Sequence, residues 1–214
     1  MNRTTFIIDG FNLYHSLEEA ARKLDSGSRG TKWLNLRALC ASYLHVIGGG
    51  AHLEQVYYFS ALAKHLEATN PDVTSRHRAY LRALESTGVV VRLSRFKAKD
   101  WRCPHCGARN VRHEEKETDV ALGAKLFEVF ARDECDTVVI VTGDTDIAPA
   151  VRTASALYPM KRIAFAFPFA RRNNELAQLV PTSFQIRKEA YAAHQFDDPL
   201  RLPDGGIVSK PPTW

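Results

Sequence analysis

The chain has 214 residues, of which 45% are hydrophobic and 25% charged, a composition typical of one soluble globular domain. It contains no apolar stretch of about 18 residues, and Asp9 ends the first apolar run too early for a signal peptide, so we expect no membrane span and no secretion. The expected location is the cytoplasm, where cysteines stay reduced. A formal net charge of +5 favours a polyanionic partner such as nucleic acid over a merely solvated basic surface.

Apolar strands and amphipathic helices alternate along most of the chain. We predict strands at 6–8, 53–61, 89–96, 135–143, 161–168 and 182–188. We predict helices at 12–24, 36–47, 71–88, 118–133, 145–159 and 172–180. Asn35 and Thr118 are the expected N-caps of the second and fourth helices, and residues 25–32 are expected to form a flexible polar loop. The alternation predicts an α/β fold with a mainly parallel sheet covered by helices on both faces.

The domain prediction is one unit, residues 1–195, with an insertion at about 97–116 that carries a Cys-x-x-Cys turn. Residues 196–214 are rich in Pro and Gly and are expected to form a loosely attached tail.

Four aspartates stand where strands end or helices begin. Asp9 follows the first strand, Asp144 and Asp146 follow the fourth, and Asp119 opens a helix. Ligands of parallel sheets bind beyond the carboxyl ends of the strands, and Mg²⁺ or Mn²⁺ prefers carboxylate oxygens. Taken singly, each Asp is more often a turn or helix-start residue; together they favour a metal site that activates water for phosphodiester hydrolysis.

Three motifs, in order, then resemble those of NYN domains: "FIIDGFNLYHSL", "EEKETDVALGAKL" and "VVIVTGDTDIAPAV". The resemblance covers about residues 4–190 and implies membership of the PIN-like nuclease group. It implies a three-layer sandwich of helices around the sheet and a ribonuclease that uses Mg²⁺ or Mn²⁺ to hydrolyse RNA. Related nucleases often pair, so a homodimer is a further expectation.

The resemblance also implies roles for single residues. It makes Asp9, Asp119, Asp144 and Asp146 the catalytic, metal-binding acids and places Asn12 at the rim, where it holds a phosphate or a metal-bound water. Other residues are expected near the substrate: Thr142, Thr145, Lys116, Lys125, Arg171 and Arg172. The two threonines are expected to orient water or, more often, to cap the helix. Lys125 stands where many relatives have a further acid, and a surface Lys is favoured over a phosphate-facing one.

Cys103 and Cys106 form half of a zinc site, which needs four ligands. His105 and His113 are the remaining candidates, with poor expected geometry, and a reduced hairpin without metal is the favoured alternative. Around this turn, Trp101, Arg102, Arg109 and Arg112 suit single-stranded RNA by stacking and charge.

Two other functions stay open. One is an inactive NYN-type RNA-binding or scaffold protein, against which the four intact acids argue. The other is an acid-metal phosphatase, which is weakened because Phe11 stands where a dehalogenase-like enzyme needs a second Asp. The P-loop sequence is missing.

Overall fold

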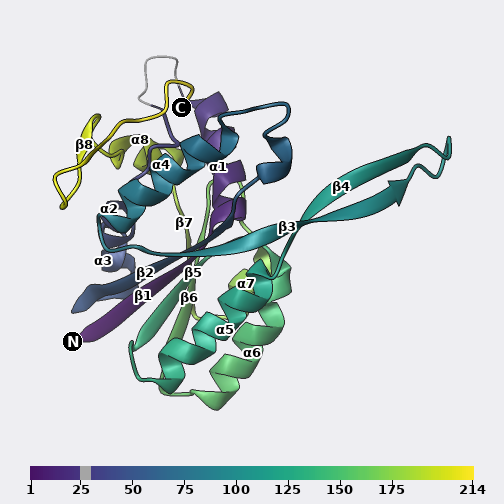
Figure 1. The fold of residues 1–214 in the computed structure, drawn as a ribbon. Helices are drawn as coiled ribbons and strands as arrows, with labels where there is room; N and C mark the ends of the chain where they lie inside the picture. The colour runs from purple at the N-terminus through teal and green to yellow at the C-terminus, as the bar shows by residue number, and fades with distance from the viewer. Residues whose placement is uncertain (25–29) are drawn as a thin grey trace.

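The computed structural model describes residues 1–24 and 30–214, and its centre is a seven-stranded sheet (Figure 1). The strand order is β4-β3-β2-β1-β5-β6-β7, and every neighbouring pair except β3/β4 is parallel. The strands are β1 (Asn2–Asp9), β2 (Ala51–Ala61), β3 (Val90–Arg102), β4 (Arg109–Lys116), β5 (Thr137–Val141), β6 (Arg162–Phe167) and β7 (Thr182–Gln185). The predicted α/β class and mainly parallel sheet are confirmed.

Helices cover both faces of the sheet. One face carries α1 (Gly10–Lys23), α2 (Leu36–Ser42), α3 (Leu44–Ile47), α4 (Val73–Glu85) and α8 (Lys188–Ala193). The other carries α5 (Thr118–Ala131), α6 (Ala148–Leu157) and α7 (Asn174–Gln178). The side chains of each strand alternate between two cores, so that Phe6 and Ile8 pack under the first group of helices and Ile7 under the second. This three-layer arrangement leaves the strand ends free to build a site.

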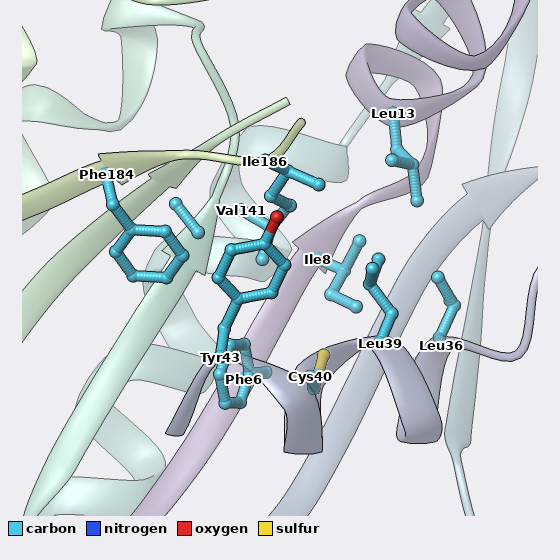
Figure 2. A pocket seen from close by; sticks show the side chains of 11 residues that line it. Phe6, Ile8, Leu13, Leu36, Leu39, Cys40, Tyr43, Val141, Phe184 and Ile186 are labelled. Atoms are coloured by element: carbon cyan, nitrogen blue, oxygen red, sulfur yellow. The ribbon is translucent and has the colours of Figure 1, made fainter. Parts of the chain in front are cut away.

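The interior beneath α2 is closely packed (Figure 2). Phe6, Ile8, Leu39 and Tyr43 surround a space of about 10 Å³, which is about enough for one water molecule. The Tyr43 hydroxyl leaves this apolar surface to accept a hydrogen bond of 3.1 Å from the backbone N–H of Arg187. This cavity is therefore a packing gap and not a ligand site.

The predicted Cys-x-x-Cys insertion is a β-hairpin that extends away from the body of the domain (Figure 1). Strand β3 runs without a break from the sheet into this arm, where Arg95 to Arg102 pair with β4. At the tip, the Cys103 carbonyl accepts a 2.9 Å bond from Gly107, whose φ of +70° suits a glycine. The arm therefore shares its backbone with the third strand of the central sheet.

Two local helix predictions are wrong. The helix expected at 36–47 is capped by Asn35 as predicted, but it divides at Tyr43 into α2 and α3. Thr118 is not the N-cap of α5; Glu117 holds that position without a side-chain bond, while the Thr118 hydroxyl donates to Glu115. The central part of the loop expected at 25–32, residues 25–29, lies outside the described residues.

The expectation of a loosely attached tail is also wrong. After Gln195, the tail forms the two-stranded sheet β8 (Leu200–Arg201) and β9 (Ile207–Val208), and the side chains of Phe196, Leu202 and Val208 are buried. The Trp33 indole donates to the Asp197 carbonyl at 3.1 Å, and the Trp214 ring lies 5.6 Å from that of Tyr80. In the parts of the chain that the structure describes, no helix combines the length and apolarity needed to cross a membrane.

Candidate active site

Asp9 is the last residue of β1 and the N-cap of α1, so one side chain joins the sheet edge to a helix start. Its Oδ1 accepts a 2.9 Å bond from the backbone N–H of Asn12. Gly10 follows because the chain passes close to β2: a Cβ there would lie 2.4 Å from the Phe59 carbonyl oxygen. The Asp-Gly pair therefore combines a cap with the only residue type that fits the close approach.

Thr142 connects the ends of β1 and β5, which are adjacent parallel strands. Its hydroxyl donates to Asp9 Oδ2 at 2.8 Å and accepts from the Asp144 backbone N–H at 3.1 Å. The Thr142 side chain is buried, so it positions Asp9 and does not face a substrate. After β1, the strands β2 and β3 are added on one side, and β5 and β6 are added on the other. Such a switch in strand order is where α/β sheets bind ligands.

A second set of bonds connects α1 to the turn after β5. Asn12 Oδ1 accepts a 3.0 Å bond from the Gly143 N–H, and the Asn173 side chain donates to the Gly143 carbonyl at 3.3 Å. A Cβ at Gly143 would lie 2.1 Å from the Arg171 carbonyl oxygen, so the loop after β6 packs directly on this turn. Asn12 therefore holds the turn of the site, and Arg171 and Arg172 are exposed at the same end of the sheet.

Asp144 and Asp146 lie two residues apart on an exposed turn that begins a 3-10 helix, η2 (Thr145–Ile147). Asp144 is the cap of this helix, because its Oδ1 accepts a 3.1 Å bond from the Asp146 N–H. The prediction that Thr142 or Thr145 caps the helix is therefore wrong. Capping occupies one oxygen of Asp144, and both Asp144 and Asp146 are exposed to solvent.

Asp119 lies in the first turn of α5, two residues after the strained N-cap residue Glu117. Glu117 adopts a left-handed conformation with φ of +79° and forms an ion pair with Arg95 at 2.5 Å. Partial burial raises the pKa of Asp119, and the negative charges of Asp144, Asp9 and Asp146 raise it further, in that order. The charged groups that act most strongly on Asp119 are thus all carboxylates.

The pKa of Asp9 is raised in the same way. Burial is the largest cause, hydrogen bonds from Asn12 and Thr142 oppose it, and the charge of Asp144 raises it again. Among the described residues, none of the four predicted acids forms an ion pair. Carboxylates that raise each other's pKa without a protein cation are chemically suited to a divalent ion.

Comparison with known proteins decides the family. A model of the NYN domain matches residues 3–184. The chain belongs to the NYN domain family. NYN domains are part of the PIN-like nuclease group, as the sequence motifs indicated. Comparison with curated proteins gives no match. A crystal structure of a protein of unknown function from Vibrio parahaemolyticus has the same fold, with a TM-score of 0.57 at 17% identity, over 87% of this chain and 93% of that chain.

Glu115 is an acid of this NYN domain that the sequence analysis did not single out. It lies near the end of β4, where its Oε1 accepts a 2.6 Å bond from Thr118. Burial raises its pKa, and the charges of Asp9 and Asp119 raise it further. The "EEKETD" run contained this residue, but only the antiparallel pairing of β4 with β3 places it beside the aspartates.

Lys125 does not lie at the carboxyl edge of the sheet, where the acids are, and both expectations for it are wrong. Its side chain is 10% exposed, lies 4.6 Å from the centre of the Tyr57 ring and forms an ion pair with Glu128. It is therefore neither a surface Lys nor a phosphate-facing one. Lys116, in contrast, is exposed at the end of β4 and pairs with Glu114 at 2.9 Å, so it stays at the rim.

The cysteine pair lies at the tip of the arm, away from the acids. Both Cys103 and Cys106 are free thiols, and hydrogen bonds from the turn, first from Cys106 and then from His105, lower the pKa of Cys103. His113 pairs with Ala98, four residues down the strand from the Arg102–Arg109 pair, which is about 13 Å away. The structure therefore does not bring His113 to the thiols.

The acids also form no closed metal cage as they lie. Across residues 1–24 and 30–214, no three His, Cys, Asp or Glu side chains are arranged to hold a metal ion. For the cysteines this leaves zinc without a third ligand. For Asp9, Asp119, Asp144 and Asp146 the charges suit a divalent ion, but the exposed side chains must rotate toward it.

Proposed function

We propose that this NYN domain is a metal-dependent ribonuclease that hydrolyses RNA phosphodiester bonds. The observation that carries the proposal is the set of five carboxylates at the carboxyl edge of the sheet: Asp9, Glu115, Asp119, Asp144 and Asp146. Desolvation and the charges of neighbouring carboxylates raise the pKa values of Asp9, Glu115 and Asp119, and among the described residues none of these three acids forms an ion pair with Lys or Arg. A protein gains nothing in stability from such an arrangement, so a ligand of opposite charge is its best explanation.

In this proposal, Asp9, Asp119, Asp144 and Asp146 hold Mg²⁺ or Mn²⁺. Three of the four lie on turns or in first helical turns, where rotation of a short side chain is sufficient to change where its oxygens point. When bound, such an ion supplies an activated water at neutral pH and neutralises the departing oxygen. Asp9 is the fixed point of the set, because it is buried and both of its oxygens accept hydrogen bonds.

The other residues of the site then have positioning roles. Thr142 keeps Asp9 and the Asp144 backbone in register, and Asn12 keeps the Gly143 turn against α1. Arg171, Arg172 and Lys116 lie exposed at this edge, where their charges suit the phosphates that flank the reacting bond. The net charge of +5 brings a polyanion toward a site whose own acids would repel it.

The decisive experiment is cleavage of single-stranded RNA by the purified protein with Mn²⁺ or Mg²⁺. Cleavage is expected with either ion, and a chelator is expected to abolish it. Asp144→Asn keeps the cap of η2 but removes a negative charge, and we expect it to lower the rate at least about 100-fold. Asp204→Asn is the matched control, because this exposed Asp lies on the β8–β9 turn; its rate is expected to equal that of wild type.

Two results would contradict the proposal. Cleavage that persists unchanged in a chelator or in Asp144→Asn would remove the acids from the mechanism. Binding of RNA without cleavage under any divalent ion would instead support the inactive RNA-binding alternative. Titration of Mn²⁺ followed by electron paramagnetic resonance gives a readout independent of activity: Asp144→Asn is expected to weaken binding of the ion.

A further inference from the structure

A second cavity, of about 530 Å³, lies next to the end of β2, where β3 continues from the sheet into the arm. It is formed by the 3-10 helix η1 (Lys64–Leu66), by Arg78 of α4 and by the base of the β3–β4 arm. We call it the hairpin groove and define it by Lys64, His65, Arg78, Arg95, Phe96 and His113. Its volume is within the range of sites that bind small organic groups.

The charged residues that line the hairpin groove are all positive. Lys64, Arg78 and Arg95 line it, and no Asp or Glu does. Arg95 forms an ion pair with Glu117, whereas neither Lys64 nor Arg78 has an acidic partner within the described part of the chain. The arm adds to this field: residues 90–116 hold eight Lys or Arg and three Asp or Glu, a net charge of +5. Positive charge in a groove without acids suits phosphate groups.

Three rings stand together in the groove. The imidazoles of His65 and His113 stack with their centres 4.1 Å apart and their planes 7° apart. Phe96 meets His65 edge-on at 4.7 Å. Burial, and then the neighbouring His113, lowers the pKa of His65, which favours the uncharged imidazole, so this ring contributes a surface for stacking more than a charge. Aromatic rings of this kind bind unpaired nucleic acid bases.

The hairpin groove lies next to the carboxylates at the carboxyl edge of the sheet. Phe96 pairs directly with Glu115 across the β3–β4 ladder, so the two side chains leave the same face of the arm. The Glu115 carboxylate in turn interacts with Asp9 and Asp119. A nucleic acid chain with one base against the Phe96 ring would therefore have its neighbouring phosphate close to the acids.

We propose that the hairpin groove binds a base and the flanking phosphates of single-stranded RNA, next to the bond that the acids cleave. The proposal rests on the ribonuclease function proposed above. Only an unpaired base offers its faces to the rings of Phe96, His65 and His113, because a duplex keeps its bases stacked on each other. The specificity of the enzyme for unpaired RNA would then come from the base of the β3–β4 arm.

The test measures binding separately from cleavage. A fluorescent single-stranded 12-nucleotide RNA is titrated in a chelator, and anisotropy gives the affinity. Phe96→Ala is expected to weaken binding roughly tenfold, since it removes a stacking surface. Lys64→Ala is expected to weaken it about threefold and to lower the salt dependence by about one released counterion. Melting curves of both variants show whether the arm is still folded.

Two further variants keep the interpretation clear. His113→Ala removes an exposed ring that stacks on His65, and it is expected to weaken binding about as much as Phe96→Ala. Because His113 is more exposed than Phe96, its loss is less apt to loosen the arm. Lys97→Ala is the matched control for Lys64→Ala: it removes the same charge, but Lys97 pairs with Glu114 on the opposite face of the arm. Its affinity is expected to stay within about twofold of wild type.

The inference is overturned if Phe96→Ala and His113→Ala both bind the RNA as tightly as wild type, or if a duplex competes as well as the single strand. Should wild type cleave RNA while the groove variants bind and cleave as wild type does, the inference fails and the ribonuclease function stands. Should wild type never cleave while the groove variants lose binding, the ribonuclease function fails and RNA binding in the groove is supported.

Discussion

β1 and β5 have carboxylates near both of their ends, but only at the amino ends are those charges paired with cations from the protein. At the amino ends, Arg3 donates to Asp136 at 2.8 Å and to Asp133 at 3.0 Å, and Lys161 also contacts Asp133. The hydrogen bond from Arg3 holds the pKa of Asp136 well below its usual range, and Lys161 followed by Arg3 lowers the pKa of Asp133. These acids help to hold the strand ends together.

At the carboxyl ends of the same strands, Asp9 and Asp119 lie near Asp144 and Asp146, and their pKa values are raised. The acids that stabilise the fold have cations from the protein, and those at the proposed site have none. This difference separates structural from chemical acids better than their sequence context does, because both groups occur in turns next to strands.

The largest expected effect is the loss of cleavage in Asp9→Asn. Asparagine still accepts the bond from the Asn12 N–H but removes the charge at the fixed point of the metal site. Loss of a partner that only supports a metal ligand typically costs 10–100-fold, so loss of the ligand itself is expected to cost at least about 100-fold. The measurement is the initial rate of cleavage of single-stranded RNA in Mn²⁺.

Asp136→Asn is the control at the other end of the strands. Because Asp136 is held by Arg3 and lies at the amino ends, this substitution is expected to leave the rate within about twofold of wild type. Equal losses in both variants would show that the two ends do not differ in function.

The next effect concerns Thr142, which positions Asp9. Thr142→Val keeps the buried shape but removes the 2.8 Å bond to Asp9 Oδ2, and the rate is expected to fall about 10–100-fold. Thr142→Ser keeps the hydroxyl and is expected to recover most of the rate. Thr145→Val, three residues further along the same turn, leaves the Thr142–Asp9 bond in place and is expected to change the rate little. If Thr142→Ser were as slow as Thr142→Val, the hydroxyl would not be the cause.

The fold itself was largely predictable from the sequence, because strands and helices alternate with clear periods. The tail was not. Its Pro and Gly residues indicate irregular structure, but they do not show that Phe196, Leu202 and Val208 each reach an apolar neighbour. Contacts such as that of Trp33 with Asp197 join residues far apart in the sequence, which local patterns cannot express.

The site was predictable only in part, for a related reason. Asp9 and Asp144 follow strands whose neighbouring position explains their meeting. Glu115 reaches the same place through the register of the β3–β4 arm, which no periodicity defines. Lys125 was misplaced because a Lys on a helix is usually exposed, whereas here Glu128 and the Tyr57 ring give its ammonium group a buried environment.

A smaller effect, of opposite sign at the two ends, is expected in the stability of the metal-free protein. Asp119→Asn removes repulsion among the acids, so at pH 7 it is expected to raise the free energy of unfolding by less than about 1 kcal/mol, because Asp119 is exposed to solvent. Asp136→Asn removes a bonded charge and is expected to lower stability. Urea unfolding in a chelator measures both.

The pH dependence follows from the directions of the pKa shifts. The raised pKa of Asp119 means that its destabilising charge develops as the pH rises above the unfolded value of 3.8, so the gain in Asp119→Asn vanishes in acid. The lowered pKa of Asp136 means that its stabilising contribution is present above 3.8 and is lost as the pH falls below it. A gain in Asp119→Asn that grew in acid would contradict this account.

The smallest effect distinguishes a cation at the site edge from a cation in the core. Arg172 is exposed, with its guanidinium group 6.0 Å from the Phe167 ring, and Arg172→Ala is expected to weaken RNA binding about threefold and to reduce its salt dependence. Lys125→Met keeps a long side chain over the Tyr57 ring but removes the charge next to Glu128. Its RNA affinity and salt dependence are expected to equal those of wild type, because that charge is already neutralised inside the protein. A reduced salt dependence in Lys125→Met would mean that the buried ammonium group is part of the field that the RNA meets.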